Sequence, residues 1–199
     1  MDNNKCEVFI SYSRADYIDV ERNVIPGNAI SMIKEAFDEA GVTYWFDEAV
    51  ELRESGLTEP LLVLGFTPVA LAAKLSAYKI SQAVYGLEYA RELSKACEKS
   101  GVSVDVHIKV DTGMSRIGFM CQSFPRDEAS IDEIVEACSL KGLEAEGIMA
   151  HFSVADEGEE GREYTENQLS SFDYTVNALK EKGIEFDIVH HANSAGTED

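Results

Sequence analysis

The stretch Val104-Asp-Val-His-Ile-Lys-Val-Asp111 lies in the most strand-like segment of the chain, and the prediction of the fold starts from it. Its side chains alternate, so four aliphatic residues face one side and the other side carries Asp105, His107, Lys109 and Asp111. Such a polar face is ordinary on an exposed antiparallel strand, but a parallel strand covered by helices is buried on both faces. Buried charges need partners, so we expect Lys109 to have a carboxylate or anionic partner. This polar face then lines a functional site or, alternatively, forms a purely structural ion pair.

The surrounding sequence repeats one pattern, which is an amphipathic helix, a glycine and then a strand. Ala90, Leu93 and Cys97 mark a helix that Gly101 ends just before the strand at 102–110. Asp47 is expected to cap a short helix, and capping boxes at 130–133 and 165–168 are expected to open two longer helices. The predicted strands are 8–10, 42–46, 61–64, 80–85, 102–110, 143–149 and 184–190.

Regular alternation of strands and helices predicts an α/β fold with a parallel sheet and helices outside it. Right-handed crossovers leave two architectures open, namely an open doubly wound sheet and a closed β/α barrel. A complete barrel needs eight strands and typically ~250 residues. The chain has 199 residues, so as a barrel it would be one strand short.

Composition excludes several functional classes. The chain has 37 acidic and 17 basic side chains, a net charge of −20 and a pI near 4.5, which argues against binding to nucleic acid or to anionic membrane surfaces. No stretch approaches the ~18 apolar residues of a membrane span, and residues 1–5 do not resemble a signal sequence, so we expect a cytoplasmic protein. The four cysteines are scattered without a CxxC pair, which predicts neither a disulfide framework nor a zinc site.

Polar residues gather just after the predicted strands, where parallel α/β folds place their sites. Thr112, Gly113 and Arg116 follow the fifth strand, and His151 follows the sixth. The seventh strand is followed by hydroxyl and amide groups suited to a phosphate. The histidines suggest a metal only weakly, because no helical HxxxH pair or carboxylate triad accompanies them, and we expect no metal site. The polar residues after the seventh strand are His190, His191, Asn193 and Ser194.

Three motifs carry a family resemblance. Val106-His-Ile-Lys-Val-Asp-Thr-Gly-Met-Ser-Arg-Ile-Gly118, His151-Phe-Ser-Val-Ala-Asp156 and Val189-His-His-Ala-Asn-Ser-Ala195 resemble the alanine racemase family in order and spacing, over about residues 48–196. The resemblance implies a pyridoxal-phosphate enzyme that interconverts L- and D-alanine for peptidoglycan synthesis. It also implies a β/α barrel, a β-rich C-terminal domain and a head-to-tail homodimer. We therefore expect an incomplete TIM-like barrel of about seven parallel strands that lacks the C-terminal domain.

The resemblance also implies which residues hold the cofactor. Arg116 matches the arginine that faces its phenolic oxygen, and Lys109 matches the lysine, often carbamylated in the family, that orients this arginine. His151 matches the histidine beside the ring, and His190 matches the histidine that supports an arginine at the pyridine nitrogen. Ser194 matches a phosphate ligand. The cofactor-binding residues expected in this chain are thus Arg116, Lys109, His151, His190, Asn193 and Ser194.

The family's two catalytic bases have no match in this chain. One base is a lysine just after the first strand, where this sequence has Ser11 or Tyr12. The other is a tyrosine of the C-terminal domain, which would lie beyond Asp199, as would the arginine at the pyridine nitrogen. We therefore assign no catalytic residue here and expect racemisation of an amino-acid substrate to be impaired.

The first 48 residues carry a second resemblance. Glu7-Val-Phe-Ile-Ser-Tyr-Ser-Arg-Ala-Asp16 is similar to the opening strand of TIR domains, and Ala40-Gly-Val-Thr-Tyr-Trp-Phe-Asp-Glu48 to their second strand. We expect a TIR-like strand-helix-strand fragment over 1–48 and a partial racemase barrel domain over 49–199, packed as one unit. Two alternatives stay open, which are a TIR-type signalling or self-association module and a gene chimera without a selected function.

Overall fold

The computed structural model of the chain describes residues 45–122 and 128–191. These residues belong to one compact unit, Trp45–Asp199. The strand expected at 8–10 and the TIR-like fragment up to residue 44 lie outside the described residues. The same holds for Asn193 and Ser194.

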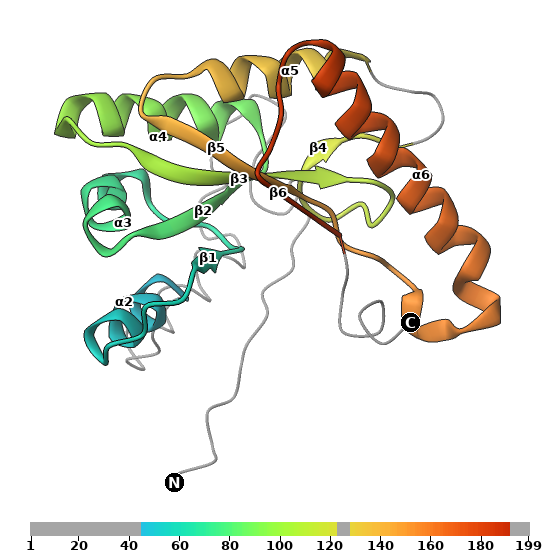
Figure 1. Cartoon of the computed structure of the whole chain (residues 1–199), viewed down its shortest axis with the longest axis horizontal. Helices are drawn as coiled ribbons and strands as arrows, with labels where there is room; N and C mark the ends of the chain where they lie inside the picture. The colour runs from blue at the N-terminus through green and yellow to red at the C-terminus, as the bar shows by residue number, and fades with distance from the viewer. Residues whose placement is uncertain (1–44, 123–127, 192–199) are drawn as a thin grey trace, which may run out of the picture. The chain divides into compact units, whose positions relative to one another are not determined.

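A parallel sheet forms the centre of the described unit (Figure 1). Its strands pair in the order β1-β2-β3-β5-β6, and β4 pairs with β3. Every pair is parallel. The strands are β1 (Leu61–Val63), β2 (Ile80–Val84), β3 (Val104–Asp111), β4 (Phe119–Met120), β5 (Leu143–Met149) and β6 (Ile188–His190).

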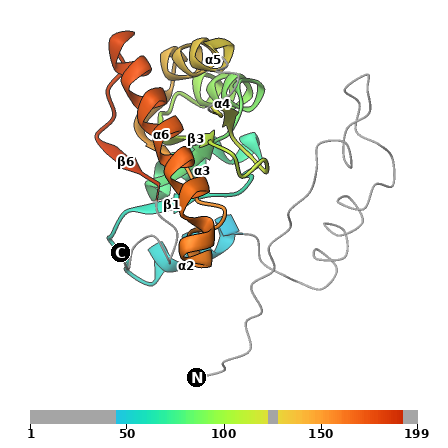
Figure 2. The same ribbon diagram turned by 90° about the vertical axis from the view of Figure 1, so that its right-hand side faces the viewer.

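Helices connect successive strands, except that a loop joins β3 to β4, and they lie along the outside of the sheet (Figures 1 and 2). Along this side α3 packs on α4, α4 on α5, and α5 on α6. The result is a curled half-barrel, which confirms the expected incomplete TIM-like α/β fold. The helices are α2 (Trp45–Glu54), α3 (Ala72–Tyr78), α4 (Leu87–Ser100), α5 (Glu128–Ser139) and α6 (Glu159–Glu181), with short 3-10 turns at Val69–Leu71 and Ala155–Glu157.

The hydrophobic core lies between the sheet and these helices. Helix residues such as Leu75, Leu93 and Ile134 are fully buried there against the aliphatic positions of β3. Burial of one such side chain stabilises the fold by roughly 1.5–3 kcal/mol. The alternation within β3 is therefore as predicted, with valines and Ile108 toward the helices and polar side chains on the opposite face. Asp105 is an exception to the expected burial, because it is exposed near the beginning of the strand.

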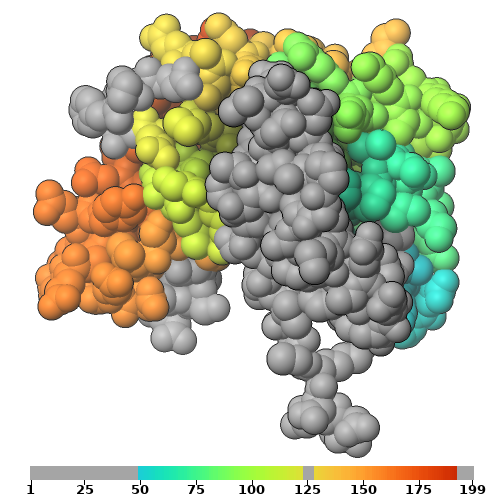
Figure 3. All heavy atoms as spheres, turned by 180° about the vertical axis from the view of Figure 1, so that it is seen from behind, coloured from blue at the N-terminus to red at the C-terminus, as the bar shows by residue number. Residues whose placement is uncertain are grey.

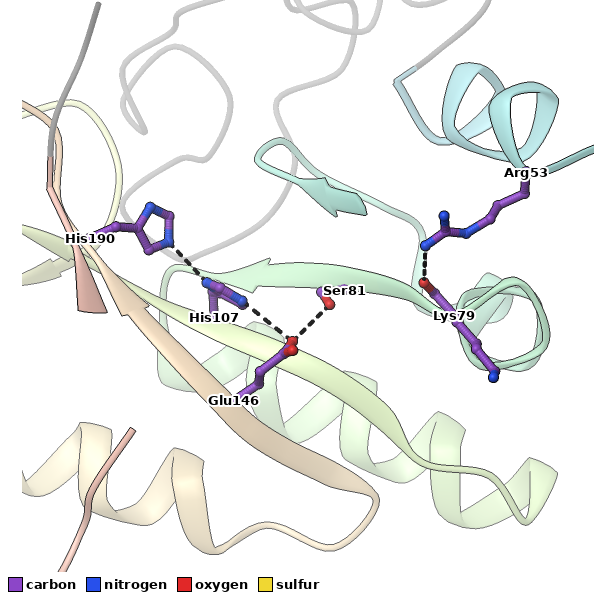
Figure 4. Close-up of polar contacts among 6 residues, drawn as sticks. All are labelled: Arg53, Lys79, Ser81, His107, Glu146 and His190. Carbon is purple, nitrogen blue, oxygen red and sulfur yellow. Dashed lines mark hydrogen bonds and ion pairs between the residues drawn. The ribbon is translucent and has the colours of Figure 1, made fainter. Parts of the chain in front are cut away.

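Two details show what ends a helix in this fold and what holds neighbouring helices together. Gly101 ends α4 in the left-handed conformation, with φ 66°, as expected for the glycine after a helix. Arg53 of α2 reaches the end of α3, where its guanidinium donates to the carbonyl oxygens of Tyr78 and Lys79, each at 2.9 Å. Figure 4 shows the contact with Lys79. Carbonyls at the end of a helix lack partners within that helix, so Arg53 stabilises the end of α3.

Three local expectations are wrong. The strand predicted at 42–46 is wrong at its end, because Trp45 and Phe46 belong to α2. The capping boxes are wrong as well, since Ser130 and Thr165 both lie inside helices, and the Thr165 hydroxyl donates to the carbonyl of Gly161 one turn earlier. The pattern of a serine or threonine followed by an acid or amide also occurs in helix interiors. Strand β4 was not predicted, because two residues are too short to show a periodicity.

None of the helices in the described part of the chain is long and apolar enough to cross a membrane.

Candidate functional site

The inner face of β3 carries three buried polar side chains in a row. His107, Lys109 and Asp111 are each at most 7% exposed. They lie on the face opposite the helices, as the alternation of the strand predicts. Strand β3 has neighbours on both sides, β2 and β5, so residues of several strands meet this row. The site is therefore built on rigid backbone.

Lys109 is a buried amine. Its Nζ donates to the carbonyl of Val110 at 3.1 Å. Burial lowers the pKa of Lys109 to about 8, the Asp111 carboxylate opposes this shift, and the Arg116 guanidinium adds to it. Over residues 45–122 and 128–191 no carboxylate lies within 4.0 Å of this nitrogen, so the expected carboxylate partner is not found in this part of the chain.

The loop after β3 carries Arg116 and is shaped by Asp111. The Asp111 Oδ1 accepts hydrogen bonds from the backbone N–H groups of Gly113 and Ser115, both at 2.9 Å. Gly118 then brings the chain back against the strand, with φ 132°, and a Cβ there would lie 2.8 Å from the Asp111 nitrogen. The loop is thus held in one conformation, while the Arg116 side chain is exposed.

His151 lies just after β5 and is half-buried. Burial lowers its pKa, and the positive charges of Lys109 and Arg116 lower it further. Lys109 pairs with Met149 across β3 and β5, two residues before His151, so these residues come from the ends of neighbouring strands. The structure thus brings the described residues of this group to the carboxyl ends of neighbouring strands, as the sequence predicts, and their role in holding a cofactor stays a prediction.

Helix α6 holds the two loops that carry Arg116 and His151. The buried Gln168 accepts a hydrogen bond from the Ser153 N–H at 2.9 Å and donates to the His151 carbonyl at 3.2 Å. The Tyr164 hydroxyl donates to the Gly113 carbonyl at 2.7 Å. In the space-filling view the yellow-green segment after β3 lies against the orange N-terminal part of α6 (Figure 3). The helix therefore fixes the two loops relative to each other.

His190, at the end of β6, contacts His107 across the sheet (Figure 4). Its Nε2 lies 3.0 Å from Nδ1 of His107. On the other side of the His107 ring, Nε2 lies 3.4 Å from a carboxylate oxygen of Glu146. His190 is therefore connected to the interior of the sheet, and not only to the loops at its edge.

Sequence reasoning identified most but not all of these groups. Lys109, His151 and His190 lie around the inner face, and Arg116 lies on the adjoining loop. Glu146 and Gln168 were missed. No motif marks Glu146, and Gln168 was interpreted as half of a capping box. In residues 45–122 and 128–191 no group of three or more His, Cys, Asp or Glu side chains is arranged to hold a metal ion.

Comparisons with known proteins agree with the geometry. The family model described as Alanine racemase, N-terminal domain, matches residues 27–199. The chain is 43% identical over 149 residues to an alanine racemase of Clostridium tetani, a match that covers 75% of this chain and 37% of that protein. It is 41% identical to alanine racemase 1 of Clostridium acetobutylicum, covering 74% of this chain and 36% of that protein.

A solved structure shows the same similarity to alanine racemases. The alanine racemase of Clostridium difficile 630 in complex with cycloserine matches with a TM-score of 0.70 and 37% identity, over 77% of this chain and 40% of that one. The chain thus spans about two-fifths of the length of the relatives it matches. The motifs around Lys109, His151 and His190, the curled parallel sheet and the match over residues 27–199 agree, and the chain belongs to the alanine racemase family.

Proposed function

We propose that the inner face of this half-barrel and the adjoining loops bind pyridoxal phosphate, and that the chain supports racemisation of alanine only weakly. The observation that carries the proposal is the buried Lys109 amine next to Arg116. Burial disfavours the positive charge of Lys109 and lowers its pKa, and the Arg116 guanidinium adds to this effect. An anionic ligand would relieve this repulsion.

The residues present fit this cofactor. Its phenolic oxygen and phosphate are anionic groups, and Lys109 and Arg116 supply positive charge that Asp111 offsets in part. Asp111 itself accepts two backbone hydrogen bonds, which leaves the cationic groups available. By the family resemblance, Arg116 would face the phenolic oxygen, Lys109 would orient Arg116, and His151 would lie beside the ring. Asn193 and Ser194 would contact the phosphate.

The chain's own contribution is to hold the cofactor and to orient the residues around it. When bound, pyridoxal phosphate supplies an electron sink for the carbanion formed at Cα of an amino acid. Gln168 and Tyr164 keep the Arg116 and His151 loops in place, and positioning of this kind contributes much of the rate in such enzymes. The lysine base that the resemblance implies just after the first strand has no match in this chain, where Ser11 or Tyr12 stands, so we expect racemisation to be impaired.

The TIR-like segment supports a second candidate function. Residues 7–16 and 40–48 resemble TIR strands, and the racemase family model, which begins at residue 27, leaves the first of these stretches unmatched and includes the second. A TIR-type self-association module with the racemase part as scaffold is the corresponding proposal, and a gene chimera without a selected function is its alternative. The chimera could arise by recombination or by an error in assembling reads. Sequencing genomic DNA across the codons for residues 46–52 separates these two origins, because an intact open reading frame there contradicts an assembly error.

Binding can be tested by titrating the full chain with pyridoxal phosphate and measuring its absorbance. We expect saturable binding that Arg116→Ala weakens at least about tenfold, since hydrogen bonds to charged groups contribute roughly 1.5–3 kcal/mol. Arg91→Ala is the matched control, because Arg91 is exposed and pairs with Glu136 on the helical surface. Equal affinity of the two variants would contradict the proposed site, and absence of binding to the wild type would leave only the scaffold function.

A further inference from the structure

Four polar side chains from four strands form a continuous series across the inner face of the sheet (Figure 4). The Ser81 hydroxyl of β2 donates to Oε2 of Glu146 on β5 at 2.9 Å. The same oxygen lies 3.4 Å from Nε2 of His107 on β3. Nδ1 of His107 then lies 3.0 Å from Nε2 of His190 on β6. We call these four residues the polar series.

The backbone is shaped to make the central contact. Val106 pairs with Ala145 and His107 pairs with Gly147, so Glu146 is an extra residue in β5 and forms a β-bulge. Bulges redirect side chains and are frequent beside functional sites. Glycine is also required at position 147, because a Cβ there would lie 2.5 Å from Nδ1 and Cε1 of His107. The bulge and the glycine together let the Glu146 carboxylate and the His107 ring meet.

The chemistry of these groups determines where the protons lie. A carboxylate accepts hydrogen bonds and does not donate them, so the 3.4 Å approach of the Glu146 oxygen favours a proton on Nε2 of His107. A neutral imidazole has only one N–H, which leaves Nδ1 of His107 as an acceptor. The 3.0 Å contact then requires Nε2 of His190 to donate, and Nδ1 of His190 is left with a free electron pair.

Both rings are neutral near physiological pH. Burial lowers the pKa of His107, although the charges of Glu146 and Asp105 oppose the shift. Burial also lowers the pKa of His190, and His107, His191 and Lys109 lower it further. An ordinary histidine has a pKa near 6.5, so both residues are uncharged at about pH 7.5.

We propose that Glu146 is a positioning residue that sets the tautomers of His107 and His190, so that His190 presents an unprotonated Nδ1. In Figure 4 this nitrogen is directed away from His107. A group that donates a hydrogen bond suits this nitrogen, whereas a carboxylate does not. The tautomers belong to the chain itself, so this inference goes beyond cofactor binding and stands or falls separately from it.

Nitrogen-15 NMR of the histidine-labelled full chain at about pH 7.5 tests the inference. The chain has four histidines, which keeps the spectrum simple. We expect protonated Nε2 and unprotonated Nδ1 at both His107 and His190. In Glu146→Leu, which removes the acceptor, the tautomer ratio of both rings should shift toward protonated Nδ1 by at least about tenfold, since the interaction that favours a proton on Nε2 of His107 is lost. Glu146→Gln keeps an acceptor oxygen and should restore the wild-type ratio.

Glu144→Leu is the matched control, because Glu144 lies on the same strand and is exposed. It should leave both tautomers unchanged. A protonated Nδ1 at either ring of the wild type would overturn the inference, and this result does not depend on whether any variant folds. An unchanged ratio in a folded Glu146→Leu variant would overturn it as well. Binding of pyridoxal phosphate is measured separately, so failure of one proposal is distinguishable from failure of the other.

Discussion

Lys109 combines a charge with nearly complete burial, and this combination makes stability depend on pH. Its pKa falls from 10.5 to about 8 in the folded chain, so between these values the unfolded chain binds more protons than the folded one. Stability therefore rises as the pH increases from about 8 to about 10.5. This rise in the free energy of unfolding amounts to about 3 kcal/mol in total. Below pH 8 the folded state is destabilised by this full amount.

The corresponding prediction concerns Lys109→Met, which keeps a side chain of similar length without the charge. The free energy of unfolding of the variant should exceed that of the wild type most below pH 8, and the difference should shrink toward pH 10.5. Urea unfolding at a series of pH values measures it. If the free energies of unfolding of the two proteins changed in parallel with pH, the Lys109 amine would not be desolvated as described.

Gly147 is a second residue whose role is local and testable. A methyl group there would lie 2.5 Å from the His107 ring, so Gly147→Ala should displace the ring and destabilise the fold by about 1–3 kcal/mol. In a His107→Ala background the clash is gone, and the same substitution should cost much less. A double-mutant cycle by urea unfolding measures the coupling. Additive effects would mean that the two residues do not meet.

Among the secondary-structure elements, α6 links the two loops of the site through Gln168. This side chain is 1% exposed, and Gln168→Leu would leave the Ser153 N–H and the His151 carbonyl without their partner. We expect a loss of stability of about 1–3 kcal/mol and faster amide hydrogen exchange at Ser153. Asn167→Leu, one position earlier on the exposed face of the helix, serves as the control. Unchanged exchange at Ser153 in Gln168→Leu would argue that the loop does not depend on α6.

The helices and strands also show which features local sequence patterns can predict. Strands β1, β2, β3, β5 and β6 were expected to within a few residues, because apolar runs and the glycines after helices are local signals. The beginnings of α5 and α6 were misplaced, since a capping motif and a helix interior share the same spacing. Glu146 was missed for a different reason. Its direction depends on a bulge, and strict alternation along β5 does not reveal one.

Across the molecule as a whole, family membership and fold agree. The described unit holds the strands that carry Lys109, His151 and His190, and the chain covers 37% of the Clostridium tetani relative. The motif residues at the ends of the strands were predictable because parallel strands bring their carboxyl ends together. The polar series inside the sheet was not predictable, because it joins residues far apart in the sequence.

The central proposal is that this half-barrel binds the family's cofactor, pyridoxal phosphate. Equilibrium dialysis of the full chain against pyridoxal phosphate, compared with a Lys109→Met/Arg116→Ala double variant, tests it most directly. We expect saturable, stoichiometric retention by the wild type and its loss in the double variant. Absence of retention by the wild type, or equal retention by the folded double variant, would contradict the proposed cofactor site.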